Sequence, residues 1–216
     1  MTQQDKIFII GLPRTGTTSV CASLLELGFS VAHTAYTQQT FSQAQAIADT
    51  PIFNDFALLD SAYPNSKFIY LTRELTLWLP SIQQLLQRMA ANLLRNDGGF
   101  NPIIKRCYLN TFTPFTVTNI NNMEFLERCY QQHQKQVLQH FQACPEKLLT
   151  IDISQVNAYQ QLCRFLLLPE KQERFQAMNK GGKITAWNEL THPRKIPSTN
   201  KGRSSKLAYF EQSLIR

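Results

Sequence analysis

Short apolar runs alternate along the chain with longer segments in which apolar residues recur every three or four positions. Continuous apolar runs indicate buried strands, and the longer spacing indicates amphipathic helices. The runs that we interpret as strands are 7–10, 51–55 and 67–73, with an extended segment at 29–33. The predicted helices are 16–27, 38–48, 78–93 (with Pro80 in its first turn) and 123–142. This alternation predicts an α/β fold of three layers, in which a central parallel sheet is flanked by helices.

The length of 216 residues is typical of a single domain, which we expect to span residues 1–216. Turn residues cluster at 96–102 and mark the clearest break between elements. Residues 103–122 are rich in Thr and Asn and predict no regular element. Over 179–216 we expect irregular chain, except for a short helix near Leu207.

The segment Gly-Leu-Pro-Arg-Thr-Gly-Thr-Thr-Ser at 11–19 joins the first predicted strand to the first predicted helix. Backbone N–H groups in such a turn form a concavity that binds anions, and the start of the helix adds unpaired donors. The spacing of Gly11 and Gly16 is that of a Walker A loop, but Thr17 stands where that loop carries lysine. The nearest cation is Arg14. The segment therefore predicts a phosphate-binding loop without the lysine of ATP-binding loops; a helix cap that binds no ligand is the alternative.

A second candidate anion site follows the strand predicted at 67–73. Arg73 stands at its carboxyl end, and Ser81 comes eight residues later in the next predicted helix. Ligands of open α/β sheets bind beyond the carboxyl ends of the strands. We therefore expect Arg73 and Ser81 at the same edge of the sheet as the loop, although Arg73 in a surface ion pair is the other interpretation. Two anion sites at one edge predict a nucleotide with phosphates at both ends.

The two motifs together resemble those of the sulfotransferases that use 3′-phosphoadenosine 5′-phosphosulfate (PAPS). In that family the loop matched by 13–18 binds the 5′-phosphosulfate, and the residues matched by Arg73 and Ser81 bind the 3′-phosphate. Segments 146–153, 162–169 and 175–179 resemble the strand, packing helix and Phe/Asn segment near the end of many bacterial members. The resemblance implies a P-loop fold like that of nucleoside kinases, PAPS as donor, PAP as product and no metal. The cofactor-binding residues that it implies are Leu12, Pro13, Arg14, Thr15, Gly16, Thr17, Thr18, Ser19, Arg73 and Ser81.

Many members of that family also carry a late glycine-rich basic loop that closes over the 3′-phosphate. The segment 180–183 with Trp187 is similar, but Trp187 is one residue away from the usual spacing. Lys201, Gly202 and Arg203 form a second candidate, which we favour for cofactor binding. A solvated basic tail is the alternative.

The resemblance also implies catalytic residues. In sulfuryl transfer, negative charge builds on the bridging oxygen of the leaving phosphate, and we assign Arg14 to neutralise it because a guanidinium can bind two oxygens at once. A hydroxyl acceptor needs a general base, for which His33 and Asp55 are the main candidates and Asp49 is the third. His33 has a suitable pKa at neutral pH, and Asp55 stands where other members place their catalytic residue. A purely structural role is the alternative for each of the three.

Composition adds a few expectations about partners and location. The net charge of +7 favours anionic ligands, and the lack of a clustered basic helix argues against nucleic acid as a partner. No apolar run reaches the length of a membrane span, and residues 1–6 do not begin a signal peptide. The five cysteines lack metal-ligand spacing. These features predict a cytoplasmic protein with reduced thiols.

The sequence thus predicts a PAPS-dependent sulfotransferase that acts on a hydroxyl or amine of a small-molecule, carbohydrate or lipid acceptor. We expect residues 103–122 to shape the acceptor pocket. One alternative is a P-loop kinase, for which Asp152 is the only candidate Walker B residue. The other is a catalytically silent module that binds PAP. The sequence leaves the acceptor and the oligomeric state open.

Overall fold

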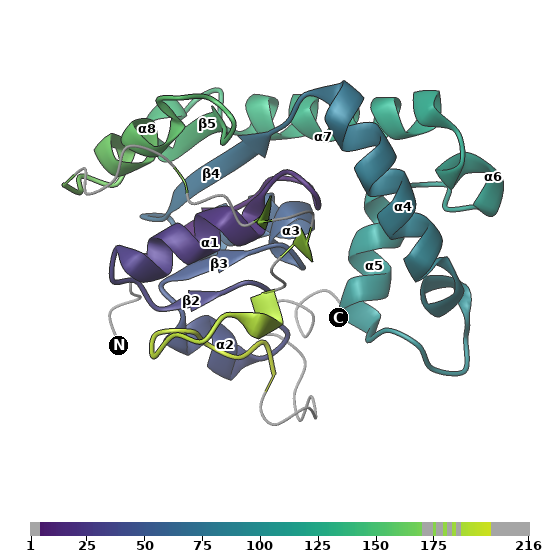
Figure 1. Ribbon diagram of the computed structural model, residues 1–216, viewed down its shortest axis with the longest axis horizontal. Coiled ribbons are helices and arrows are strands. Elements are labelled where there is room, and N and C mark those ends of the chain that lie inside the picture. The colour runs from purple at the N-terminus through teal and green to yellow at the C-terminus, as the bar shows by residue number, and fades with distance from the viewer. Residues whose placement is uncertain (1–4, 170–174, 176–178, 181–182, 185–186, 200–216) are drawn as a thin grey trace.

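The computed structural model describes residues 5–169, 175, 179–180, 183–184 and 187–199. Five parallel strands form a central sheet in the order β2-β3-β1-β4-β5. The strands are β1 (Ile7–Ile9), β2 (Val31–Ala32), β3 (Ala46–Ala48), β4 (Lys67–Thr72) and β5 (Leu148–Asp152). Helices cover the sheet (Figure 1), so the predicted α/β fold with a central parallel sheet is confirmed.

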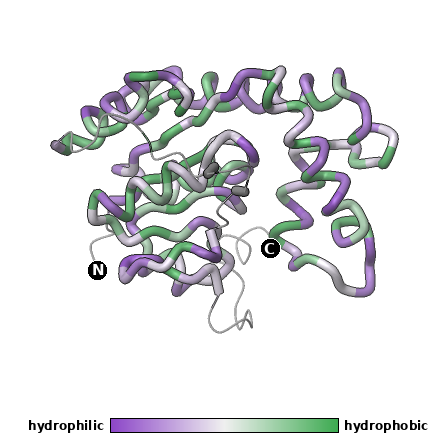
Figure 2. The backbone as a smooth tube through the Cα atoms, in the orientation of Figure 1, coloured by the Kyte–Doolittle hydropathy of each residue, from purple (hydrophilic) through white to green (hydrophobic). Residues whose placement is uncertain are grey.

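Two hydrophobic cores lie on opposite faces of the sheet. One core joins Ile9 and Leu71 to α1 (Thr17–Glu26) and α8 (Ala158–Phe165). The other joins Phe8 and Tyr70 to the helices of the second face. Those helices are α3 (Ile52–Ala62), α4 (Leu75–Leu94), α5 (Pro102–Thr111) and α7 (Met123–His140). Because both faces of β1 and β4 are buried, these strands are continuous apolar runs in the sequence; Figure 2 shows hydrophobic positions along the central strands.

The remaining elements are short. They are α2 (Gln38–Gln43), α6 (Val117–Ile120), the 3₁₀ helices η1 (Pro145–Lys147) and η2 (Trp187–Glu189), and the antiparallel pair β6 (Asn179–Lys180) and β7 (Lys183–Ile184). Part of the segment expected to be irregular, 187–199, returns to the edge of the sheet. There Val31 N–H donates to Arg194 O at 3.0 Å, and Ile196 N–H donates to Val31 O at 2.8 Å. The helix expected near Leu207 lies outside the described residues.

The predictions for 38–55 were wrong in one respect that matters for the site. The helix expected at 38–48 ends at Gln43, and residues 46–48 form β3 instead. The strand expected at 51–55 is instead the first part of α3. Ala46–Ala48 is a strand because it lies between β2 and β1, where its residues are fully buried. This burial outweighs the low strand propensity of alanine.

The position of Pro80 also differs from the prediction. Helix α4 begins at Leu75, so Pro80 lies inside the helix and not in its first turn. Proline removes a helical hydrogen bond, and the buried face of α4 offsets this loss with Trp78, Ile82, Leu86 and Leu93. Residues 103–122, which predicted no element, form most of α5 and all of α6. Within the described parts of the chain, no helix combines the length and hydrophobicity of a membrane span.

Candidate functional site

The loop between β1 and α1 is held in a conformation that leaves its backbone facing a cavity. Gly16 begins α1 with a φ of 102°, in the left-handed region that favours glycine. A Cβ at Gly16 would also meet the side chain of Ile153, which would have to shift. Thr15 Oγ1 donates to Leu12 O at 2.7 Å and closes the turn. Leu12 itself is buried beneath the loop and is not part of the cavity wall.

Arg73 and Ser81 lie directly against this loop. Arg14 Nε donates to Ser81 Oγ at 2.8 Å, and Arg73 Nη1 donates to Arg14 O at 2.7 Å. Trp78 Nε1 donates to Pro13 O at 2.9 Å and fixes the loop to α4. The structure thus brings together the two candidate anion-binding motifs, which the sequence separates by about fifty residues.

Two further arginines act on Arg14, in a cavity that the carboxylates of Asp49, Glu74 and Asp152 also line. Burial lowers the pKa of Arg14, and the positive charges of Arg88 and Arg73 lower it further. A guanidinium stays protonated in proteins, so the three arginines create a positive field at the cavity. In the part of the chain that the structure describes, none of the three forms an ion pair with a carboxylate. Such a site is suited to a multiply charged anion.

The backbone of Arg73 is held in place by hydrogen bonds to a tyrosine side chain. It directly follows β4, and Tyr130 Oη accepts a hydrogen bond from Arg73 N–H at 3.0 Å and donates to Arg73 O at 3.2 Å. Tyr130 comes from α7, which lies across the sheet from α1. Tyr130 therefore fixes the start of the connection from β4 to α4, a role that no motif in the sequence indicates.

His33 directly follows β2 and contacts the other end of the loop. Its Nε2 lies 3.2 Å from Thr17 Oγ1 and 3.1 Å from Thr18 Oγ1. Burial lowers the pKa of His33; the negative charge of Asp49 opposes this, and Lys195 adds to it. The imidazole is therefore mainly neutral at pH 7 and can accept a hydrogen bond from a loop hydroxyl. Its ring also packs on the Trp187 ring, with centroids 5.5 Å apart.

These groups line one cavity of about 560 Å³ at the carboxyl edge of the sheet. Residues 13–19 form its floor, with Arg73 and Ser81 on one side and His33 and Asp49 on the other. Tyr108 of α5 also lines it. Tyr108 belongs to the segment that was expected to shape an acceptor pocket, but no motif singled it out in the sequence.

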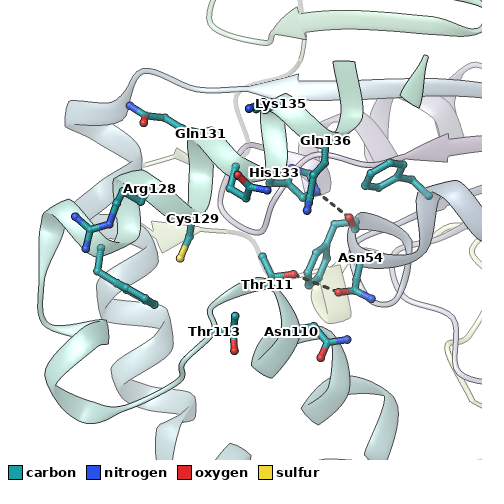
Figure 3. A pocket seen from close by; sticks show the side chains of 14 residues that line it. Asn54, Asn110, Thr111, Thr113, Arg128, Cys129, Gln131, His133, Lys135 and Gln136 are labelled. Atoms are coloured by element: carbon teal, nitrogen blue, oxygen red, sulfur yellow. Dashed lines mark hydrogen bonds between the residues drawn. The ribbon is translucent and has the colours of Figure 1, made fainter. Parts of the chain in front are cut away.

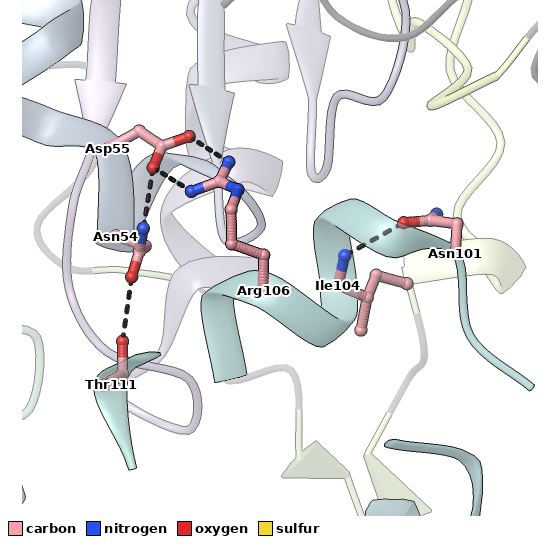
Figure 4. Close-up of polar contacts among 6 residues, drawn as sticks. All are labelled: Asn54, Asp55, Asn101, Ile104, Arg106 and Thr111. Atoms are coloured by element: carbon pink, nitrogen blue, oxygen red, sulfur yellow. Dashed lines mark hydrogen bonds and ion pairs between the residues drawn. The ribbon is translucent and has the colours of Figure 1, made fainter. Parts of the chain in front are cut away.

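Asp55 is not part of this cavity, in contrast to its predicted role as a base. Its carboxylate is buried and accepts two hydrogen bonds from Arg106, Nη1 to Oδ1 and Nη2 to Oδ2, each at 2.7 Å (Figure 4). Asn54 Nδ2 also donates to Asp55 Oδ1 at 2.7 Å. The geometry therefore assigns Asp55 to joining α3 and α5. The prediction relied on a strand at 51–55, whereas the strand ends at Ala48 and places Asp49 at the sheet edge.

A second, more open cavity of about 850 Å³ lies among α3, α5 and α7 (Figure 3). Amide side chains such as Asn54 and Gln136 line it, together with His133. His133 Nε2 donates to Phe53 O at 2.8 Å. Phe53 lines this second cavity and packs edge-on against Tyr108, with ring centroids 5.6 Å apart, so the two rings separate the two cavities.

The candidates for the late basic loop are only partly visible. Lys201, Gly202 and Arg203 lie outside the described residues. Of the alternative segment, Lys180 and Lys183 pair in β6 and β7.

Comparison with protein families agrees with this geometry. A family model described as a sulfotransferase domain matches residues 6–39 and 34–184. A search of curated proteins gave no match. The two matched segments contain all five strands, the 11–19 loop, His33, Arg73 and Ser81. Since the family model covers most of the 216 residues, the chain belongs to the sulfotransferase family.

Proposed function

We propose that the protein transfers the sulfuryl group of PAPS to a hydroxyl or amine of a small-molecule, carbohydrate or lipid acceptor. The observation that carries this proposal is the contact of Arg14 with both Ser81 and Arg73. This contact supports a nucleotide with separate 5′ and 3′ phosphates, because such a nucleotide needs two neighbouring groups of anion-binding residues. The family match supports sulfuryl transfer in general, and the three clustered arginines support a highly charged donor.

In this proposal the loop, Arg73 with Ser81, and Arg14 each have a separate function. The N–H groups of the loop and the start of α1 bind the 5′-phosphosulfate of the donor. Arg73 and Ser81 bind the 3′-phosphate. Arg14 stabilises the charge that develops on the leaving phosphate, because its guanidinium remains charged and can contact two oxygens. The donor supplies an activated sulfuryl group, so the protein has to orient the reactants and to move one proton.

Two of the three candidate bases line the cavity, namely His33 and Asp49. His33 is engaged through Nε2 with the Thr17 and Thr18 hydroxyls, which suits a role in holding the loop. Asp49 follows β3 without such a contact to the loop. We therefore propose Asp49 as the base and His33 as a residue that positions Thr17 and Thr18.

The nucleotide is tested by thermal unfolding with PAP, ADP and ATP. Ligand binding raises the melting temperature according to affinity alone, so no acceptor is needed. We expect PAP to stabilise more than ADP, because hydrogen bonds between a charged residue and a phosphate contribute about 1.5–3 kcal/mol, or roughly 10–150-fold in affinity. Arg73→Ala should remove this advantage. Arg128→Ala is the matched control, since Arg128 is exposed on α7 and lies outside this cavity.

The other outcomes separate the alternatives. Stronger stabilisation by ATP than by PAP, with a requirement for Mg²⁺, would favour a kinase and overturn the proposal. PAP binding without sulfuryl transfer to any acceptor would indicate a silent PAP-binding module. Activity that persists in excess EDTA would agree with PAPS chemistry, which needs no metal.

A further inference from the structure

The order of the strands divides the cavity into two halves. Loop 11–19 follows the central strand β1. On one side of β1 lie Arg73, which follows β4, and residues 152–154 at the end of β5. His33 and Asp49 follow β2 and β3 on the other side. With Arg73 assigned to the donor nucleotide, the half beside β2 and β3 is left for the acceptor.

Asp49 supplies a carboxylate to this second half. Within the described residues the only hydrogen bond to the Asp49 side chain comes from Thr50, whose Oγ1 donates to Asp49 Oδ1 at 3.0 Å, and this carboxylate forms no ion pair. The Asp49 carboxylate is only partly buried. It is therefore able to accept a hydrogen bond from a ligand in the cavity.

Tyr108 supplies a phenol to the same cavity, and the charge of Asp49 acts on it. Its ring is 4% exposed and is held edge-on by Phe53 at 5.6 Å and stacked on Phe112 at 6.1 Å. No hydrogen bond of its hydroxyl occurs among the residues that the structure describes. Burial raises the pKa of Tyr108 well above its usual value, and the charge of Asp49 raises it further. The phenol thus stays protonated at neutral pH and can donate a hydrogen bond.

The helix that carries Tyr108 is fixed in place by the contact described above between α3 and α5. Arg106, two residues before Tyr108, binds the buried Asp55 through two hydrogen bonds (Figure 4). At the other end of α5, Asn101 Oδ1 accepts from Ile104 N–H at 2.9 Å and caps the helix. The position of the phenol is therefore set by a helix and not by a loop.

A hydrogen-bond donor and a carboxylate that line the same cavity suit only some acceptor groups. A neutral hydroxyl accepts one hydrogen bond and donates another, so it satisfies both Tyr108 and Asp49. A carboxylate or phosphate would face the negative charge of Asp49. An ammonium group would bind Asp49, but it has no lone pair to attack sulfur until it loses a proton.

We propose that Tyr108 is an acceptor-binding residue, and that the group sulfated by this enzyme is an uncharged hydroxyl held between Tyr108 and Asp49. This inference rests on the proposed PAPS-dependent activity. In the step that follows, the hydroxyl oxygen forms a bond to sulfur while the bond from sulfur to the bridging oxygen of the 5′-phosphate breaks. The hydroxyl proton passes to Asp49, and the electron pair of the broken bond leaves with PAP. The products are a sulfate monoester and PAP.

The test uses small acceptor probes that share a carbon skeleton and differ in their polar group. Benzyl alcohol, benzylamine and benzoate form one set; cyclohexanol, cyclohexylamine and cyclohexanecarboxylate form another. Binding to the full-length protein saturated with PAP is measured by saturation-transfer NMR, and sulfation is measured with radiolabelled PAPS. The variants are Tyr108→Phe, which keeps the ring packing, and Asp49→Asn. Asparagine suits the left-handed φ of 50° at residue 49. Tyr63→Phe is the control, because Tyr63 packs on Phe8 away from the cavity.

We expect the alcohols to bind most tightly and to be sulfated. Tyr108→Phe should weaken alcohol binding about five- to tenfold, the usual effect of one lost hydrogen bond, and should leave PAP binding unchanged. Asp49→Asn should lower sulfation at least about a hundredfold while alcohol binding persists. Tyr63→Phe should change neither.

Three results would overturn the inference while PAP still binds. They are alcohol binding that Tyr108→Phe does not weaken, tighter binding of the amines or carboxylates, and no binding of either alcohol. Loss of PAP binding by the wild-type protein would be a different result, because it contradicts the proposed donor itself.

Discussion

Replacing Gly11 by alanine tests how closely the phosphate loop packs on the sheet. A Cβ at residue 11 would lie 2.6 Å from Leu71 Cβ, 2.7 Å from Thr15 Oγ1 and 2.9 Å from Leu71 O. Carbon atoms in contact prefer separations of about 3.5–4.0 Å, so the loop would have to move away from β4 by about 1 Å. Overpacking of this kind costs about 1–3 kcal/mol. Disturbing the hydrogen bond from Thr15 to Leu12 adds about 1 kcal/mol.

We therefore expect Gly11→Ala to lower the free energy of unfolding by about 2–4 kcal/mol, or the melting temperature by roughly 4–16 °C for a chain of this length. Urea unfolding followed by circular dichroism measures the loss, and calorimetry measures the accompanying loss of PAP affinity. Gly28→Ala is the matched control: its φ is 95°, and no atom lies within 4 Å of the added Cβ, so it reports backbone strain alone, about 1–2 kcal/mol. A Gly11→Ala protein as stable as the wild type, with normal PAP affinity, would refute the packing described for the loop.

Three further predictions concern the charged and buried groups. Arg14→Ala should lower the sulfation rate at saturating PAPS by about 100–1000-fold; benzyl alcohol sulfation measures it, and near-normal turnover would contradict the role of Arg14. Asp55→Asn should lower the free energy of unfolding by about 3 kcal/mol, because it removes the negative charge that accepts two hydrogen bonds from Arg106, yet the pH profile of turnover should keep its shape; loss of the acidic limb, the fall in rate at low pH, would make Asp55 the base after all. Burial lowers the pKa of His133 from 6.5 to about 4. The unfolded chain therefore takes up this proton first as the pH falls, and up to about 3 kcal/mol of stability is lost between about pH 6.5 and pH 4. In urea titrations across this range, His133→Gln should show a smaller loss than the wild type, and an equal loss would show that other groups cause it.

The strand, loop and helix at 7–27 could be predicted from the sequence because the interactions that define them are local. An apolar run, two glycines and a helix start lie within about twenty residues, and the structure places β1 and α1 at the predicted positions. Strand β4 and helix α7 were predicted for the same reason, from long and strongly patterned segments. The resemblance to the sulfotransferases, drawn from this loop together with Arg73 and Ser81, is confirmed by the family match.

The acceptor side could not be predicted in the same way, because tertiary contacts decide it. Ala46–Ala48 is three residues long and contains two alanines, so only its place between β2 and β1 makes it a strand. Assigning the strand to 51–55 moved the expected sheet edge along the chain by several residues. The carboxylate expected at the reacting centre was consequently Asp55, whereas the end of the actual strand is followed by Asp49.

Asp49, His33 and Arg73 share one structural origin, since each is the first residue after a parallel strand. A rule based on strand ends finds such residues whenever the strands are assigned correctly. Tyr108 cannot be found in this way, because it lies on a helix. Its position depends on the contact of Arg106 with Asp55, 51 residues away in the chain. Substitution of a residue after a strand is thus expected to change binding or chemistry with little effect on folding. Substitution of Asp55 is expected to change stability first and, through the displacement of α5, acceptor binding second.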